Sequence, residues 1–262
     1  MNRLEKLLAN NPRNLLAIYF TAGYPSPEGT HLTILDLDAA GADIVEIGMP
    51  FSDPLADGPT IQESSKAALE NGMSLEKLFT QLEGFRDKTN IPVLLMGYLN
   101  PVLQFGVERF CKKCHETGVD GVILPDLPLA FYEKNYRLFF EKYDLCPVFL
   151  VTPQTSDKRI RELDAASRGF LYAVSTASTT GGAGGFGKTQ TAYFQRLADL
   201  KLRNPVMVGF GISDHVAFKT VCQFANGGVV GSAFIRAQEQ GMGIHDFVQH
   251  IRGESFYTDG NR

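Results

Sequence analysis

Eight short apolar runs recur along the chain, and each is followed by a polar stretch with helical periodicity. The runs are LLAIYFTAG (15–23), ADIVEIGMPF (42–51), IPVLLMGY (91–98), VDGVILPD (119–126), CPVFLVTP (146–153), GFLYAVS (169–175), NPVMVGFGI (204–212) and GGVVGSAFI (227–235). Near-continuous apolar character is typical of parallel strands that helices bury on both faces. Eight β-then-α units in 262 residues favour a closed (β/α)8 TIM barrel over an open doubly wound sheet.

The helical segments and the absence of a linker indicate a single domain over residues 1–262. Several segments begin with a Ser, Thr or Asp that can cap the first turn. We expect an extra N-terminal helix in MNRLEKLLANN (1–11) and a loose tail in TDGNR (258–262). The clearest helical patterns are SLEKLFTQLEGFRDK (74–88), FYEKNYRLFFEKY (131–143), SDKRIRELDAAS (156–167) and TAYFQRLADLKLR (191–203).

Charge and hydropathy exclude several classes of partner. The formal net charge is -4 and the sequence pI is about 5.8, with no dense run of Lys or Arg, which argues against nucleic acid and against an anionic membrane surface. The N-terminus lacks the apolar core of a signal peptide, and no later stretch has the length of a membrane span. These features predict a cytoplasmic protein that acts on a small molecule.

The four cysteines predict neither a disulfide framework nor a metal site. Cys111, Cys114, Cys146 and Cys222 are scattered, which suits reduced thiols. Cys111 and Cys114 form a C-x-x-C beside His115, so zinc or redox chemistry has to be considered. No second ligand pair follows at zinc-finger spacing, and GVERFCKKCHETG (106–118) has the pattern of an amphipathic helix. We therefore interpret these cysteines as structural and expect no metal.

The stretch GGAGGFGKT (181–189) satisfies two nucleotide-binding patterns, G-x-x-x-x-G-K-[ST] and G-x-G-x-x-G, both starting at residue 182. A phosphate-binding loop joins its strand directly to its helix, whereas residues 175–180 intervene here. Asp126 is the only plausible magnesium-holding acid at a strand end, and the acid some twenty residues on, Asp199, falls within a helical pattern. Both readings are disfavoured, and the glycine-rich segment is expected to be a mobile lid on the catalytic face.

Glu46 is a candidate acid in the barrel interior. Alternation along residues 44–48 turns Val45 and Ile47 toward the helices and Ile44, Glu46 and Gly48 toward the lumen. An unpaired buried carboxylate is costly, so such a group is usually paired, protonated or catalytic. No basic residue lies between positions 49 and 62, but an ion pair with a distant Lys or Arg remains open. A raised pKa would suit proton transfer near neutral pH.

Other candidate residues lie in the loops after strands two, seven and eight. Asp57 in LADGP could be catalytic or an ordinary turn residue. Gly211 and Gly231 lie one βα unit apart, and Gly231 with Ser232 precedes the helical AFIRA. Loops after strands seven and eight of such barrels often bind phosphate through backbone N–H groups and a helix N-terminus. Glycines also simply permit tight turns.

The stretch EIGMPFSDPLADGPTIQ (46–62) closely resembles the signature of the tryptophan synthase alpha subunit family. Further matching stretches follow in the family's order: YFTAGYP (19–25), LLMGYLNPVLQFG (94–106), VDGVILPDLP (119–128), FLYAVS (170–175), VGFGIS (208–213) and VGSAFI (230–235). The resemblance implies a (β/α)8 barrel and a carbon-carbon lyase of tryptophan biosynthesis. Its reaction is the retro-aldol cleavage of indole-3-glycerol phosphate to indole and glyceraldehyde 3-phosphate, without a cofactor.

The resemblance also implies roles for individual residues. Glu46 matches the general acid/base that protonates the indole ring carbon. Asp57 matches the carboxylate that accepts the indole N–H hydrogen bond and stabilises positive charge on the ring. Residues matching the substrate site are Phe20, Tyr98 and Ile123 for the indole pocket, Tyr172 for another substrate-facing position, and Gly181, Phe210, Gly211, Gly231 and Ser232 for the phosphate.

The family acts with a pyridoxal-phosphate-dependent beta subunit in an alpha2-beta2 heterotetramer, and that partner consumes the indole. Positions that match the partner face are Pro50, Asp53, Pro54, Asn100 and Asp126. The chain departs from the family after strand six, where Ser178 and Thr179 replace a Gly-Val pair and glycines follow Thr180-Gly181. Extra glycine raises the entropy cost of ordering this segment.

Two rival functions remain. Another phosphate-binding barrel enzyme of aromatic amino-acid biosynthesis would typically carry a catalytic Lys on a strand, and none of the eight predicted strands contains one. A non-catalytic barrel that only activates a partner would not need Glu46 and Asp57, and both are present.

Overall fold

The computed structural model describes residues 1–54, 57–175 and 186–254. Its β segments all run parallel in one sheet, in the order β5-β4-β3-β2-β1-β9-β8-β7-β6. Each coincides with one of the predicted apolar runs. The segments are β1 (Leu15–Thr21), β2 (Ile44–Gly48), β3 (Val93–Met96), β4 (Gly121–Ile123), β5 (Cys146–Val148), β6 (Leu150–Val151), β7 (Leu171–Val174), β8 (Val206–Gly209) and β9 (Gly227–Val230).

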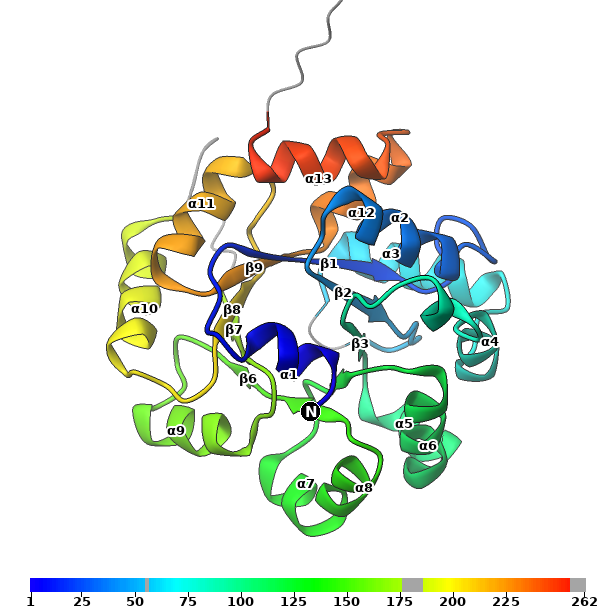
Figure 1. The fold of residues 1–262 in the computed structure, drawn as a ribbon, viewed down its shortest axis with the longest axis horizontal. Coiled ribbons are helices and arrows are strands. Elements are labelled where there is room, and N and C mark those ends of the chain that lie inside the picture. The colour runs from blue at the N-terminus through cyan, green and yellow to red at the C-terminus, as the bar shows by residue number, and fades with distance from the viewer. Residues whose placement is uncertain (55–56, 176–185, 255–262) are drawn as a thin grey trace, which may run out of the picture.

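The sheet closes because β5 and β6 together occupy one strand position. They are separated only by Phe149. β5 pairs with β4 on one side, and β6 pairs with β7 on the other. Eight strand positions therefore form a ring, and Figure 1 shows the helices that follow the strands arranged around the outside of it. The predicted (β/α)8 barrel is confirmed.

The helices follow the strands in the alternation that the sequence predicts. Ser74, Ser156 and Asp214 cap helices by accepting a hydrogen bond from a backbone N–H of the first turn. The helices are α1 (Arg3–Leu8), α2 (Thr30–Ala40), α3 (Pro59–Glu70), α4 (Leu75–Gln81), the short 3-10 helix η1 (Phe85–Asp87), α5 (Leu99–Phe105), α6 (Val107–Thr117), α7 (Leu129–Asn135), α8 (Arg137–Lys142), α9 (Asp157–Ala166), α10 (Lys188–Asp199), α11 (His215–Phe224), α12 (Ser232–Glu239) and α13 (Ile244–Arg252).

Three predicted helices have different boundaries. The segment 74–88 splits into α4 and η1 because Gly84 adopts a left-handed conformation, with φ of 73°. The segment 131–143 divides at Tyr136, which has φ of -122°. α10 begins at Lys188, where the Gln190 side chain accepts the Gly187 N–H, and it ends before Lys201, whose φ is 47°.

Two apolar layers hold the barrel together. Residues on one side of each strand, such as Ile18, Val45 and Val208, pack under the helices in the larger cluster. Residues of opposite parity, such as Ile44 and Met207, fill the lumen in a second cluster. This alternation confirms the predicted orientation of Val45, Ile47 and Ile44.

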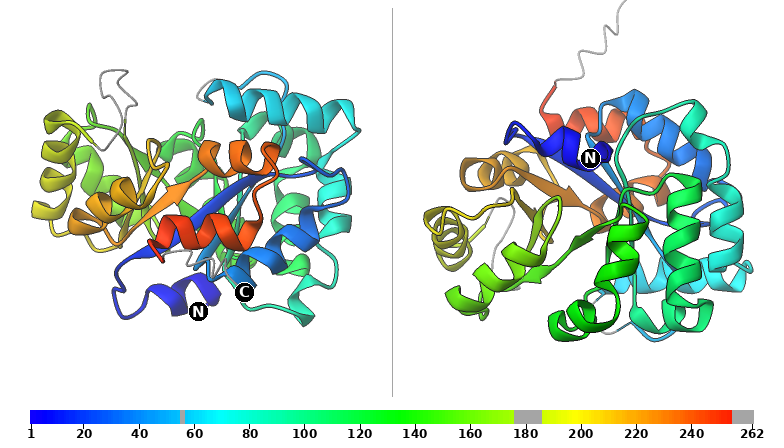
Figure 2. Two further views of the ribbon diagram at one scale, coloured as in Figure 1. Left: turned by 90° about the horizontal axis from the view of Figure 1, so that it is seen from above. Right: turned by 60° about the horizontal axis from the view of Figure 1, so that its bottom comes forward.

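α1 covers the amino-terminal end of the barrel, where Figure 2 shows it below the strands in the left view. Its Leu4 and Leu8 belong to the lumen cluster. The side chain of Asn2 caps α1 and also donates to the backbone oxygens of Asp120 and Asp144, at 2.8 and 3.0 Å. The predicted extra N-terminal helix is therefore confirmed, and it closes the end of the barrel opposite to the loops that follow the strands.

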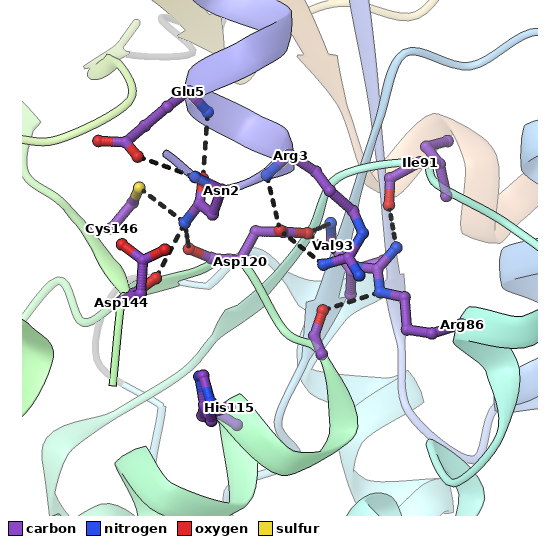
Figure 3. Close-up of polar contacts among 12 residues, drawn as sticks. Asn2, Arg3, Glu5, Arg86, Ile91, Val93, His115, Asp120, Asp144 and Cys146 are labelled. Carbon is purple, nitrogen blue, oxygen red and sulfur yellow. Dashed lines mark hydrogen bonds and ion pairs between the residues drawn. The ribbon is translucent and has the colours of Figure 1, made fainter. Parts of the chain in front are cut away.

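Asp120 anchors this end of the barrel (Figure 3). Its side chain is fully buried and accepts hydrogen bonds from both the backbone and the guanidinium of Arg3, each at 3.2 Å. Its other oxygen accepts from Arg86 at 2.7 Å and from the Val93 N–H at 3.0 Å. One carboxylate thus joins α1, η1 and β3.

In the described part of the chain, no helix combines the length and the hydropathy that crossing a membrane requires. The predicted tail 258–262 and most of the predicted lid, residues 181–185, lie outside the described residues.

Candidate active site

Glu46 lies in the barrel lumen on β2, between Tyr19 on β1 and Leu94 on β3 in the strand register. It is fully buried. Neither carboxyl oxygen has a hydrogen-bond partner among the described residues. The distant ion pair left open by the sequence is not formed by this part of the chain. Burial alone raises the pKa of Glu46 from 4.5 to about 8, so the group is a neutral acid near pH 7.

Asp57 lies in the loop between β2 and α3, just before the Gly58 that begins the helix. Its Oδ2 atom accepts a hydrogen bond from the Tyr98 hydroxyl at 3.0 Å. Burial raises the pKa of Asp57, and this hydrogen bond lowers it. The carboxylate is therefore positioned by a side chain from the end of β3, which a simple turn residue would not need.

A cavity opens at the carboxyl ends of the strands, and we call it the main cavity. Its wall combines residues from five strand ends and from α3 and α12. A smaller side cavity adjoins it and shares Tyr19, Asp57 and Met96 with it. The main cavity is lined by Tyr19, Asp57, Ile61, Met96, Tyr172, Phe210, Val229, Gly231 and Ser232.

Glu46 lies below the main cavity and is absent from the described residues that line it. The hydroxyl-bearing rings of Tyr19 and Tyr172 are its neighbours, since the charge of Glu46 contributes to raising the pKa of both phenols, which burial raises most. Both rings line the cavity. The acid thus lies next to two side chains of the cavity wall.

Phe20 does not line the cavity, and its neighbour Tyr19 does. Phe20 is buried in the cluster between the barrel and the helices, whereas Tyr19 packs on the lumen side. Both strand faces are apolar, so the sequence alone did not distinguish them. The strand register pairs Tyr19 with Glu46, and this register shows that Tyr19, and not Phe20, lies on the lumen side.

The other predicted pocket residues take different places. Tyr98 lines the side cavity and contacts the Phe51 ring in a tilted arrangement, with the ring centroids 5.3 Å apart. Tyr172 lines the main cavity. Ile123 is fully buried in the lumen cluster, below the cavity wall.

The loops after β8 and β9 form one end of the main cavity. Phe210 and Gly211 both have positive φ, 72° and 81°, and the Ser175 hydroxyl holds the turn by donating to the Phe210 carbonyl at 2.6 Å. Gly231 and Ser232 begin α12, so a helix N-terminus faces the cavity. Such a turn and helix start present backbone N–H groups that suit an anion. Gly181 lies outside the described residues.

The residues expected to meet a partner lie on the same face of the barrel. Pro50, Asp53 and Asn100 line a surface groove together with Phe51. Phe51 also lines the side cavity, so the groove adjoins the site. Two further residues lie beside it: Pro54 borders a neighbouring hollow, and Asp126 accepts the Leu99 N–H at the start of α5.

Among the described residues, neither alternative motif has the context that its site requires. Thirteen residues separate the end of β7 at Val174 from the start of α10 at Lys188, unlike a phosphate-binding loop, which joins strand to helix directly. Cys111 and Cys114 are buried on the inner face of α6. Within residues 1–54, 57–175 and 186–254, no group of three or more His, Cys, Asp or Glu side chains is arranged to hold a metal ion.

Comparison with known proteins agrees with this architecture. A family model described as tryptophan synthase alpha chain matches residues 4–253. The tryptophan synthase alpha chain of Christiangramia forsetii is 54% identical over 254 residues, which cover 96% of this chain and 99% of that one. The corresponding chain of Flavobacterium johnsoniae is 53% identical, with 96% and 100% covered.

A solved structure extends the similarity to three dimensions. The tryptophan synthase subunit alpha of Legionella pneumophila superimposes with a TM-score of 0.85 at 34% sequence identity, covering 97% of this chain and 98% of that chain. Matches of this extent in sequence and in structure lead to one conclusion: this chain belongs to the tryptophan synthase alpha chain family.

Proposed function

We propose that this chain is a carbon-carbon lyase that cleaves indole-3-glycerol phosphate into indole and glyceraldehyde 3-phosphate by a retro-aldol reaction. The observation that carries the proposal is the position of Glu46, a buried carboxyl with no hydrogen-bond partner among the described residues, next to Tyr19 and Tyr172 in the wall of a cavity that Asp57 also lines. A neutral acid and a second carboxyl in one site are what proton transfer to an electron-rich ring requires.

Glu46 donates its proton to the ring carbon that bears the glycerol chain. The carbon-carbon bond then breaks, its electron pair returns to the ring, and the hydroxyl on the departing carbon becomes the aldehyde. The hydroxyl proton returns to the Glu46 carboxylate, so the acid is regenerated. The Glu46 carboxyl can turn toward the substrate without breaking a hydrogen bond to the described residues, because neither of its oxygens forms one with them.

Asp57 stabilises the ring while it carries positive charge. Tyr98 holds one carboxylate oxygen, and the other accepts the hydrogen bond from the ring N–H. A fixed negative charge next to a developing positive charge lowers the barrier because the protein has oriented it before the reaction begins.

The ends of β8 and β9 bind the substrate phosphate. Phe210 and Gly211 form the turn, and Gly231 and Ser232 place the start of α12 at the anion. Gly181 is a further contact by resemblance to the family. The ring itself occupies the space between Tyr172 and the side cavity beside Tyr98, with Tyr19 replacing Phe20 in the wall. Ile123 supports this wall from below.

The chain works with a tryptophan synthase beta subunit in an alpha2-beta2 heterotetramer in the cytoplasm. The groove lined by Pro50, Asp53 and Asn100, with Pro54 and Asp126 beside it, receives that partner. The cleavage needs no cofactor, since the charges it develops are met by two carboxyl groups, and pyridoxal phosphate belongs to the beta subunit.

Indole release from indole-3-glycerol phosphate by the purified chain, with and without beta subunit, tests the proposal. We expect slow release alone and faster release with the partner. A chain that stimulates the beta subunit but releases no indole under either condition would instead be a non-catalytic activator. A chain that converts a different phosphorylated intermediate of aromatic amino-acid biosynthesis would be another barrel enzyme.

A further inference from the structure

The turn after β8 holds Phe210 in a backbone conformation that residues with a side chain normally avoid. Its φ is 72°, which lies in the left-handed region that glycine tolerates and a bulky residue does not. Such a conformation persists only where the surrounding structure imposes it, and it often marks a functional site. Contacts from neighbouring elements must therefore hold this turn.

Ser175, directly after β7, supplies one of these contacts. Its side chain is buried, and its Oγ atom lies 2.6 Å from the Phe210 carbonyl oxygen and 3.2 Å from that of Gly209. A carbonyl oxygen can only accept, so the Ser175 hydroxyl is the donor. The Gly209 carbonyl also accepts the Ser175 N–H, at 3.1 Å. The shorter contact, to Phe210, is therefore the main hydrogen bond of the hydroxyl.

The direction of the Phe210 carbonyl determines the direction of the next N–H group, that of Gly211. Among the described residues the only cis peptide bond is Tyr24–Pro25, and in a planar trans peptide the N–H points away from the carbonyl oxygen. β8 lies between β7 and β9 in the sheet. Because the carbonyl points to Ser175 at the end of β7, the Gly211 N–H points to the side of β9.

The other half of the proposed phosphate site lies on that side. Gly231 and Ser232 follow β9, begin α12 and line the main cavity together with Phe210. Among the described residues, the Gly211 N–H has no backbone acceptor. If the peptide were reversed, the Phe210 carbonyl would point toward the start of α12, and an acceptor in that place opposes an anion where the present arrangement offers a donor.

A ring restrains the same turn at Gly211. This glycine has φ of 81°, and a Cβ atom added to it would lie 3.1 Å from the Phe186 ring. Phe186 is itself packed edge-on against Phe194 of α10, with the ring centroids 5.1 Å apart. The turn is thus held by a hydrogen bond at Phe210 and by an aromatic side chain at Gly211.

We infer that Ser175 is a positioning residue: by fixing the peptide between Phe210 and Gly211, it directs the Gly211 N–H to the substrate phosphate beside the start of α12. The inference rests on the proposed phosphate site. Ser175 is not among the described residues that line the main cavity, so it acts through the turn and not by touching the substrate.

Ser175→Ala tests the inference with two ligands, each of which represents one part of the substrate. Glycerol 3-phosphate carries the phosphate without the ring, and indole is the ring without the phosphate. We expect the Kd of glycerol 3-phosphate to rise about 3- to 10-fold, the effect of one misdirected hydrogen bond. The Kd of indole should change less than about 2-fold. Isothermal titration calorimetry measures both.

The kinetics should divide in the same way. A phosphate contact that is equally strong in the ground state and in the transition state affects KM and not kcat. In Ser175→Ala the KM for indole-3-glycerol phosphate should therefore rise about 3- to 10-fold, while kcat changes less than about 2-fold.

Amide NMR of the nitrogen-15-labelled chain follows the Gly211 N–H directly and needs no turnover. In the unaltered chain, glycerol 3-phosphate should move the Gly211 amide proton downfield, because this N–H becomes a donor to an anion. In Ser175→Ala the same ligand should move it much less.

Two further variants separate the hydrogen bond from packing. Ser175→Cys nearly keeps the shape of the side chain but has only a weak donor, so it should weaken glycerol 3-phosphate binding as Ser175→Ala does. Ser167→Ala is the matched control at the other end of β7: its buried hydroxyl accepts the Phe149 N–H at 3.3 Å. It should leave the Kd values of both ligands unchanged.

The inference would be overturned by an equal loss of affinity for glycerol 3-phosphate and indole, or by normal glycerol 3-phosphate binding in Ser175→Cys. Should Ser175→Ala fail to fold, the cysteine variant alone decides. Failure of the proposed function is a distinct result, namely no indole release by the unaltered chain. The Gly211 amide shift would still show whether Ser175 controls anion binding at this turn.

Discussion

Glu46 owes its chemistry to what surrounds it in the lumen. The lumen cluster around β2 is apolar, with Ile44, Leu94 and Ala17 fully buried in it, and it offers the carboxyl no basic partner. Desolvation disfavours the charged form of an acid, so the proton is retained at pH values where an exposed Glu would have lost it. A group of this kind can give up its proton to substrate and recover it in one turnover.

Glu46→Gln should abolish most of the turnover while leaving the phosphate site intact. The amide preserves the volume but has no transferable proton, so kcat should fall by about 10² or more. In the unaltered chain, kcat/KM should decline as the pH rises through about 8, where Glu46 loses its proton. Steady-state rates of indole release between pH 6 and 9 provide the measurement. A variant that retains over a tenth of the normal rate would remove Glu46 from the acid/base role.

The same residue predicts a pH dependence of stability. Because the folded chain holds the proton up to about pH 8 and the unfolded chain releases it near 4.5, stability is full below pH 4.5 and declines between these values as the unfolded state is favoured. Glu46→Gln removes this penalty. We expect the variant to gain up to about 4 kcal/mol of unfolding free energy relative to the unaltered chain between pH 5 and pH 8.5. Urea unfolding at both pH values measures the gain, and a pH-independent difference would contradict it.

At the scale of elements, the amino-terminal end of the barrel depends on Asp120. The carboxylate is inaccessible to solvent and binds α1 through Arg3 and η1 through Arg86. A buried ion pair of this kind is costly to break because the remaining charges stay buried without a partner. Ion pairs at the surface contribute little to the free energy of unfolding because solvent screens them. Arg109–Glu76 is such a pair, since both of its side chains are more than half exposed.

Asp120→Asn should therefore destabilise the chain by about 3 kcal/mol, since the amide cannot accept from all four donors. Catalysis at the other end of the barrel should persist at temperatures where the variant is folded. Glu76→Gln serves as the matched control and should cost less than about 0.5 kcal/mol. Thermal unfolding of both variants makes the comparison; equal melting temperatures would show that the Asp120 cluster does not anchor α1.

The connection between β7 and α10 gives a second prediction at this scale. Lys188 and Thr189 form the first turn of α10, but thirteen residues separate this helix from the end of β7, more than a nucleotide-binding loop contains. Lys188→Ala should leave both the fold and the rate of indole release nearly unchanged. Saturable binding of ATP at micromolar concentration, present in the unaltered chain and lost in this variant, would reverse this interpretation.

At the scale of the whole molecule, the two ends of the barrel have different roles. α1 and the Asp120 cluster stabilise one end, while the cavity, the α12 N-terminus and the groove lie at the other. Because of this separation, a partner that binds the face with the cavity would not disturb the anchoring contacts. Because Phe51 borders both the groove and the side cavity, a protein seated in the groove would act directly on the wall next to Tyr98.

A beta subunit should accordingly raise the rate of indole release. Coupling free energies of about 1–3 kcal/mol correspond to roughly 5- to 150-fold activation. The chain contains no Trp, so binding can be followed by the partner's tryptophan emission without a background from this chain. Titration to saturation gives both the affinity and the activation. A rate that saturating beta subunit leaves unchanged would exclude coupling through the groove.

The sequence by itself determined the class of fold and the identity of the central acid. Eight apolar runs with helical stretches between them specify a barrel, because parallel strands must be covered on both faces. The period-2 alternation of β2 placed Glu46 in the lumen, because the apolar Val45 and Ile47 on either side of it face the helices. The EIGMPFSDPLADGPTIQ stretch then indicated the family.

Only the tertiary structure decided which neighbours these residues have. On β1 both faces are buried, so parity could not separate Phe20 from Tyr19, and the register with Glu46 was needed. The isolation of the Glu46 carboxyl among the described residues, the Tyr98–Asp57 hydrogen bond and the Thr21–Ser64 hydrogen bond each depend on side chains from different strands or helices. Periodicity describes which way a side chain points from its own element, whereas contacts between elements are set by how the closed barrel brings distant segments together.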